Sequence, residues 1–177
     1  MDTMIAVERW TPGQVRQQQN GLDALLHACV QDEASIGFVW PFTAADARAF
    51  WERQVAPAMQ AGGRALWVAR VADAVAGTVQ LDWDTPANQP HRAEVRKLLV
   101  HPDFRRRGIA RRLMLALEDG ASILGRRLLT LDTRTGDNAE PLYVSLGYQP
   151  AGVIPGFALD VRRQRYDATT LMYKWLR

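Results

Sequence analysis

The sequence lacks the features of a secreted or membrane-spanning protein. It has one cysteine, Cys29, so an internal disulfide framework is excluded and secretion is not suggested. No stretch approaches about 18 consecutive apolar residues, the length that a membrane-spanning helix needs. Residues 1–10 do not show the basic-then-apolar pattern of a signal peptide. We therefore expect a cytoplasmic protein with no membrane partner.

Common cofactor motifs are missing as well. The chain contains neither a G-x-x-x-x-G-K-[ST] loop nor a G-x-G-x-x-G fingerprint, which disfavours nucleotide hydrolysis and nicotinamide chemistry. The three histidines, His27, His91 and His101, lie far apart and show no metal-ligand spacing. We therefore expect no metal cofactor.

Lysine is scarce, whereas arginine is clustered. Of the 22 basic residues only Lys97 and Lys174 are lysines, and the net charge is only +3. Five arginines fall within eight positions, namely Arg105, Arg106, Arg107, Arg111 and Arg112. A small net charge with one dense cluster indicates a local anion site rather than a generally basic surface.

The length and the hydrophobic pattern predict one domain over residues 1–177 with a mixed α/β fold. The chain has 177 residues, of which 47% are hydrophobic, enough for a sizeable core. We expect strands at 4–10, 65–71, 75–83, 95–100, 128–131, 149–154 and 166–175. Helices are expected at 12–30, with a weak point at Gly21, and at 44–61, where Pro57 would kink or end the helix. Two more helices should begin near Gly108 and after Asn138.

Residues 95–111 have the clearest functional pattern: a strand, a turn with a proline, an arginine-rich loop and a helix start. The start of a helix offers unpaired N–H groups and a partial positive charge. Gly108 allows a ligand to approach the backbone closely, and Ala110 keeps the next contact small. Together with the flanking guanidinium groups, these features describe a pyrophosphate cradle.

The same segment resembles the GNAT N-acetyltransferase superfamily. The run R-R-R-G-I-A at residues 105–110 matches the family's [QR]-x-x-G-x-[GA] acetyl-CoA motif. The run A-E-P-L-Y-V-S-L-G-Y at residues 139–148 resembles its A-x-x-L-Y-x-x-x-G-[FY] motif. The resemblance implies a central, mixed, mostly antiparallel sheet with one splayed parallel strand pair, flanked by helices.

A narrower resemblance is to the tabtoxin-resistance acetyltransferases. It rests on residues 21–38, 92–95 and 131–133. It implies that the acceptor is a small amino-acid-like compound or toxin with a primary amine.

The family resemblance implies acetyl-CoA as the cosubstrate and assigns residues to it. The backbone of Leu98, Leu99 and Val100 would pair with the pantetheine arm. The pyrophosphate would be held by the loop and helix start, which comprise Arg105, Arg106, Arg107, Gly108, Ile109, Ala110 and Arg111.

Direct attack of an amine on the acetyl group requires a proton acceptor and a proton donor for the leaving thiolate. The narrower resemblance implies that Glu94 and Asp132 take the proton, through water. The superfamily resemblance implies that Tyr143 protonates the thiolate, and a tyrosine pKa of about 10 suits a donor at neutral pH. One departure is that the family's asparagine, seven residues before the tyrosine, is Gly136 here, with Asn138 two residues later.

Simpler interpretations of the same residues stay open at this point. The arginine run can be a solvated face, Tyr143 a core tyrosine, Glu94 a partner of Arg92 or Arg96, and Asp132 a turn cap.

Other functions also stay open. The acceptor can instead be a protein lysine or N-terminal amine, and the chain can instead bind nucleic acid or sense coenzyme A. The apolar loop at 35–42 is expected to close over an acceptor, with Phe157 and Tyr166 as further wall residues. The chain is expected to be a monomer or a homodimer.

Overall fold

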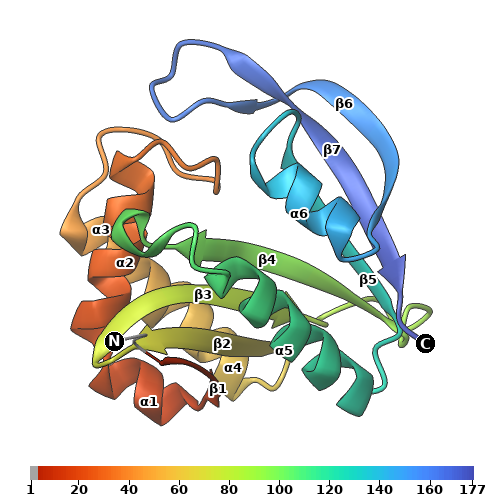
Figure 1. Cartoon of the computed structure of the whole chain (residues 1–177), viewed down its shortest axis with the longest axis horizontal. Helices are drawn as coiled ribbons and strands as arrows, with labels where there is room; N and C mark the ends of the chain where they lie inside the picture. Colours follow the sequence, from red (N-terminus) through yellow and green to blue (C-terminus); the bar gives the residue numbers. More distant parts are fainter. Residues whose placement is uncertain (1–3) are drawn as a thin grey trace.

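A computed structural model describes residues 4–177 and is built around one sheet (Figure 1). The sheet has seven strands in the order β1-β2-β3-β4-β5-β7-β6. All neighbouring strands are antiparallel except β4 and β5, which are parallel. This confirms the expected mixed, mostly antiparallel sheet. The strands are β1 (Ile5–Trp10), β2 (Arg64–Val71), β3 (Ala74–Asp82), β4 (Arg92–Val100), β5 (Leu128–Arg134), β6 (Gln149–Leu159) and β7 (Tyr166–Trp175).

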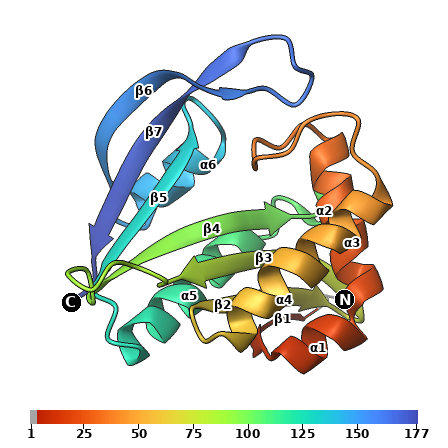
Figure 2. The ribbon, with the colours of Figure 1, turned by 180° about the vertical axis from the view of Figure 1, so that it is seen from behind.

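Helices cover both faces of the sheet, as the two opposite views show (Figures 1 and 2). One face carries α1 (Pro12–Gln17), α2 (Gln19–Gln31), α3 (Ala44–Phe50), a π-helical turn (Trp51–Val55) and α4 (Ala56–Gln60). The other face carries α5 (Ile109–Ile123) and α6 (Ala139–Ser145). A short 3-10 turn, Pro102–Phe104, connects β4 to the loop before α5.

The strand period of two divides the apolar side chains between two cores. In β2, Leu66 and Val68 pack with α2 and α3, whereas Ala65 and Trp67 pack with α5. Both sets are almost fully buried. Because both faces are covered by helices, β2 is buried and mostly apolar on both sides.

The first expected helix is two helices, and the break lies at Gln18 rather than at Gly21. Thr11 caps α1 through a capping box with Gln14, and Gln18 is both the end of α1 and the start of α2. Gly21 lies inside α2 because the helix passes close to β3. A Cβ atom there would lie 2.8 Å from Cγ2 of Val75.

Pro57 does not end the second helical segment, which runs on to Gln60. The proline lies in the first turn of α4, directly after the π-helical turn. A proline has no N–H to donate, and the first turn of a helix is where that loss is tolerated. The expected start at Thr43 is confirmed, with a capping box to Asp46.

Candidate functional site

The two parallel strands pair only at their beginnings and then diverge. Arg92–Glu94 of β4 lie beside Leu128–Thr130 of β5, and no pairing follows. Beyond Glu94, β4 stays with β3 while β5 stays with β7. Figure 1 shows the two strands diverging, with α6 beside β5. We call the region between the diverging strands the β4–β5 opening. The edge of β4 that faces β5 therefore has no strand partner over most of its length.

A bulge in β4 lies at this opening. The register with β3 shifts between Thr78 and Gln80, so Lys97 and Leu98 oppose a single residue. Lys97 has a left-handed φ of 51°. Because of the extra residue, the side chains after the bulge point to the opposite face from the one that their spacing would give. Val95 packs in the α5-side core, whereas Leu99, four residues later, packs in the α2-side core.

The first backbone N–H groups of α5 are unpaired. Gly108 precedes the helix with a φ of 76°, and no side chain caps it. The amide of Arg112 makes the first bond, 3.1 Å to the Gly108 carbonyl, so the amides of residues 109–111 have no acceptor within the helix. A Cβ atom at Gly108 would meet nothing within 4 Å. Arg106 also has a positive φ, of 64°, a conformation in which neighbouring backbone N–H groups can point toward one anion.

The arginines of this loop are only partly a solvated face. Arg105 bonds Asp32 at the end of α2 at 2.5 Å and donates to the Val100 carbonyl at 3.4 Å. Arg111 donates to Ser145 Oγ of α6 at 2.6 Å. These contacts attach the loop and the helix start to α2 and α6, and they hold the backbone donors in place.

The two candidate carboxylates lie on one face of the sheet. Glu94 is in register with Thr130, two residues before Asp132, so both side chains project to the same side. Glu94 pairs with Arg96 at 3.3 Å, one of the simpler interpretations, although both side chains stay partly exposed. Asp132 lies inside β5, where it accepts a 3.0 Å hydrogen bond from Thr169 Oγ1 and caps no turn.

Tyr143 lies on α6 against the α5-side core. It is 6% exposed, and its hydroxyl makes no hydrogen bond within residues 4–177. Burial, followed by the negative charges of Asp137 and Asp132, raises the pKa of this hydroxyl. A tyrosine in this state keeps its proton at neutral pH.

Asn138 lies in the loop directly before α6. This residue is at the N-cap position, but its side chain makes no capping hydrogen bond. Its φ of −60° is helical, which is the wrong geometry for a side-chain cap. Gly136 has a φ of 78°, and its amide is bound by Glu140 instead. The expected helix end at Gly147 is confirmed by its φ of 91°.

Comparison with known proteins identifies the family of the chain. Residues 62–150 match the model of the acetyltransferase (GNAT) domain, which is half of the chain. The chain belongs to the GNAT acetyltransferase family. The matched residues include β4, the loop before α5, Asp132 and Tyr143.

Individual relatives agree with this family. An uncharacterized N-acetyltransferase in the hisH-hisA intergenic region of Azospirillum brasilense is 35% identical over 111 residues. That match covers 62% of this chain and 65% of the relative, just under two thirds of the relative's length.

Two solved structures share the fold over nearly the whole chain. The protein yncA from Salmonella typhimurium, solved with its cofactor acetyl-CoA, aligns with a TM-score of 0.77 at 20% identity, covering 98% of this chain and 94% of that one. An N-acetyltransferase from Staphylococcus aureus Mu50 aligns with a TM-score of 0.80 at 16% identity, covering 98% and 99%. At these levels of sequence identity, the structural similarity establishes the fold alone.

In this member of the GNAT acetyltransferase family, the loop at 35–42, which was expected to close over an acceptor, contacts a segment that the motifs did not indicate. The loop between α2 and α3 contacts the connection between β6 and β7, through a 2.9 Å bond from the Trp40 amide to the Val161 carbonyl. Arg162 pairs with Glu33 and lies over the Trp40 ring. Figure 2 shows these two segments reaching toward each other above the sheet. No local sequence pattern could have revealed a pairing between segments this far apart in the chain.

Lys97 is the other missed residue. Its Nζ lies 5.5 Å from the centre of the Phe38 ring, in the loop that contacts the β6–β7 connection. The scarcity of lysine in an arginine-rich chain was the one signal that pointed to it.

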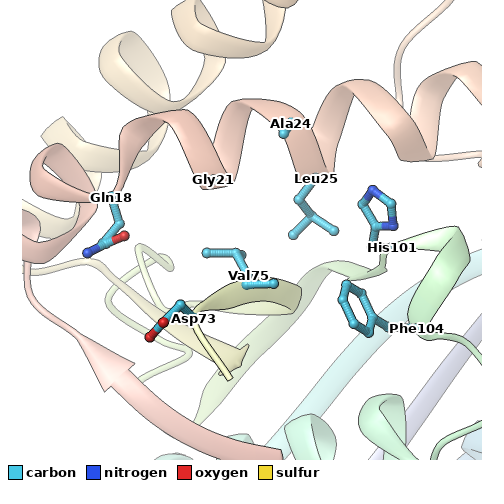
Figure 3. A pocket seen from close by; sticks show the side chains of 9 residues that line it. Gln18, Gly21, Ala24, Leu25, Asp73, Val75, His101 and Phe104 are labelled. Atoms are coloured by element: carbon cyan, nitrogen blue, oxygen red, sulfur yellow. The ribbon is translucent and has the colours of Figure 1, made fainter. Parts of the chain in front are cut away.

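A hollow elsewhere on the molecule is separate from this opening (Figure 3). It lies between α2 and the start of β3, and none of its lining residues comes from β5 or α6. The lining residues are Gln18, Gly21, Ala24, Leu25, Asp73, Ala74, Val75, His101 and Phe104. We assign it no function.

Two kinds of feature are absent from residues 4–177. No helix there is long and apolar enough to cross a membrane. No group of three or more histidine, cysteine, aspartate or glutamate side chains in that range is arranged to hold a metal ion.

Proposed function

We propose that the chain transfers the acetyl group of acetyl-CoA to a primary amine of a small, amino-acid-like molecule or toxin. The proposal rests on one observation: the β4–β5 opening has the open start of α5 and Tyr143 on one face of the sheet and two carboxylates on the other. Acetyl-CoA and an amine would therefore approach the same opening from opposite faces.

The residues at the start of α5 fit the pyrophosphate of acetyl-CoA. The space beside Gly108 is free of other atoms, and the amides of residues 109–111 are free to donate hydrogen bonds. The guanidinium groups of Arg106 and Arg107 are exposed beside them. The unpaired edge of β4 at Leu98, Leu99 and Val100 would bind the pantetheine amides, as a neighbouring strand would.

The side chains at the opening accept and donate the protons that the reaction moves. Glu94 or Asp132, through water, takes the proton that the amine loses as its nitrogen bonds to the acetyl carbon. Tyr143 donates its proton to the sulfur as the carbon–sulfur bond breaks. The raised pKa of Tyr143 keeps that proton available.

A small acceptor is favoured over a protein. The contact between Trp40 and Val161 joins two segments above the opening, which restricts the space that a protein segment would need. The resemblance at residues 21–38, 92–95 and 131–133 supports an amino-acid-like acceptor. A cytoplasmic location is part of this proposal, because the one cysteine is a free, buried thiol.

Thiol release from acetyl-CoA tests the proposal, with a panel of free amino acids, other small amines, and peptides with a free N-terminus or lysine. We expect release with small amines and little with peptides. Release with peptides alone would overturn the acceptor class but not the transfer reaction. Binding of acetyl-CoA without release for any amine would indicate a coenzyme A sensor instead.

A further inference from the structure

We propose that Lys97 binds the carboxylate of the acceptor, so that the enzyme selects free α-amino acids over plain amines. This inference rests on the proposed function, because it concerns the acceptor of that reaction. It goes beyond that function by naming the group on the acceptor that is recognised and the residue that recognises it.

The β4 bulge places Lys97 on the acceptor side of the opening. Without the extra residue, Lys97 would project to the same face as Val95, toward α5. Its left-handed φ turns the side chain instead toward Phe38, which packs against the α2-side core. Glu94 and Asp132 project to this same face.

The loop after α2 leaves space for the ammonium group. Gly37 has a φ of 87°, and a Cβ atom there would lie only 3.2 Å from Lys97 Nζ. The ammonium nitrogen of Lys97 lies 5.5 Å from the centre of the Phe38 ring, and this cation–π contact holds the ammonium group in place. The loop is itself attached to the β6–β7 connection by Trp40. Lys97 is thus positioned by a closed structure and does not extend freely into solvent.

Lys97 has no partner of opposite charge. Within residues 4–177 it makes no ion pair and no hydrogen bond, whereas the other lysine, Lys174, pairs with Glu118 at 2.7 Å. Burial is the main cause that lowers the pKa of Lys97, and the charges of Arg96 and Arg64 act in the same direction. A largely buried cation without a partner is costly, and an anionic ligand would remove that cost.

The charges around Lys97 match the two ends of an amino acid. Asp132 and Glu94 project to the same face of the sheet as the Lys97 side chain, and neither pairs with it. An acceptor that fills this space can place its amino group toward these carboxylates and its carboxylate toward Lys97. A plain amine offers nothing to the lysine, and a peptide has an uncharged amide where the carboxylate would be.

The Lys97→Met variant tests this assignment, because methionine keeps the apolar stem beside Phe38 and removes the charge. Each standard amino acid is compared with the amine that lacks its carboxylate, in thiol release from acetyl-CoA. For the best amino acid we expect the variant to raise KM by at least about 30-fold with kcat nearly unchanged. The matched amine should keep its KM, and Lys97→Arg should restore part of the amino-acid preference.

Other results would overturn the assignment. If no amino acid reacts faster than its amine in the unmodified chain, Lys97 does not select a carboxylate. If Lys97→Met lowers kcat equally for an amino acid and its amine, the lysine acts on the proton or on the structure instead. Absence of turnover with any amine would be a failure of the proposed function. In that case, the stabilisation of the coenzyme A-saturated chain by added ligands would test the inference separately. Amino acids should stabilise the unmodified chain more than the matched amines do, and this difference should be lost in Lys97→Met.

Discussion

The two sides of the β4–β5 opening are built in different ways. The side proposed for acetyl-CoA comes mostly from one continuous stretch, residues 95–111, joined by α6. The side proposed for the acceptor comes from distant segments: Phe38, Lys97, Asp132 and Val161 lie in four separate parts of the chain. The first side is defined by local backbone geometry, and the second by tertiary contacts.

The two sides should therefore respond differently to mutation. A ligand held by backbone amides depends on a few conformations that only glycine adopts easily. A ligand held by side chains from several segments depends on how those segments are held together.

The largest effect is expected for Gly108→Glu. The side chain would project into the open space beside the free amides and bring a negative charge to a site for an anion. We expect complete loss of thermal stabilisation by acetyl-CoA. Gly125→Glu is the matched control, because Gly125 has a φ of 71°, equally open surroundings and a place just past the other end of α5. Equal loss of acetyl-CoA binding in both variants would contradict a local site.

The second effect concerns Tyr143→Phe, which removes only a hydroxyl. We expect kcat to fall by about 100-fold or more, since general acid catalysis contributes about that much, while acetyl-CoA affinity stays nearly unchanged. Tyr148→Phe is the control, because the Tyr148 ring is 5.8 Å from that of Tyr143 and is equally buried. Unchanged turnover in Tyr143→Phe, measured by thiol release, would remove this tyrosine from the mechanism.

The third effect separates the two carboxylates. We expect Asp132→Asn and Glu94→Gln each to lower kcat/KM by about 10- to 100-fold, with the larger loss at the main proton acceptor. Asp73→Asn, which changes an exposed carboxylate in the turn between β2 and β3, should have no effect. Full activity in both Asp132→Asn and Glu94→Gln would show that neither takes the proton.

The smallest effect is expected on the acceptor side, for Arg162→Ala. The variant loses the exposed ion pair with Glu33 and the contact with the Trp40 ring. Exposed pairs contribute little, so we expect KM for the acceptor to rise by about threefold, with acetyl-CoA affinity unchanged. Arg163→Ala, its exposed neighbour, is the control. A change in acetyl-CoA affinity in Arg162→Ala would show that the two sides are coupled.

The sequence predicted the fold where local pattern decides it. All seven strands lie where alternation and turn residues indicated, although β4 begins three residues earlier, β5 extends three residues further and β6 extends five residues further. The helix break at Gln18 was missed because no glycine or proline marks it. The proline at position 57 led us to expect a kink or an end of the helix. The helix continues because a π-helical turn places Pro57 in the first turn of α4, and that π-helical turn has no sequence signal.

The sequence proposed candidate residues on both sides of the opening. Residue types and spacing indicated the loop around Gly108, whereas Tyr143, Glu94 and Asp132 came only from the family resemblances, and their roles stay predictions. The bulge at Lys97 depends on the pairing with β3, and the closure by Trp40 depends on a contact with Val161. Both arise from strand register and loop docking, which no window of a single sequence contains.

The central claim is that the open start of α5 and the β4 edge bind acetyl-CoA. Thermal unfolding with and without acetyl-CoA, at fixed ionic strength and with free phosphate as a control, tests it most directly. At a concentration of about 100 times the dissociation constant, stabilisation should be about 2.7 kcal/mol. For a chain of this size, that corresponds to a rise in Tm of about 5–11 °C. A rise specific to acetyl-CoA is the predicted result. No rise, or one equal to that with phosphate, would reduce the arginine loop to a general anion site and contradict the account.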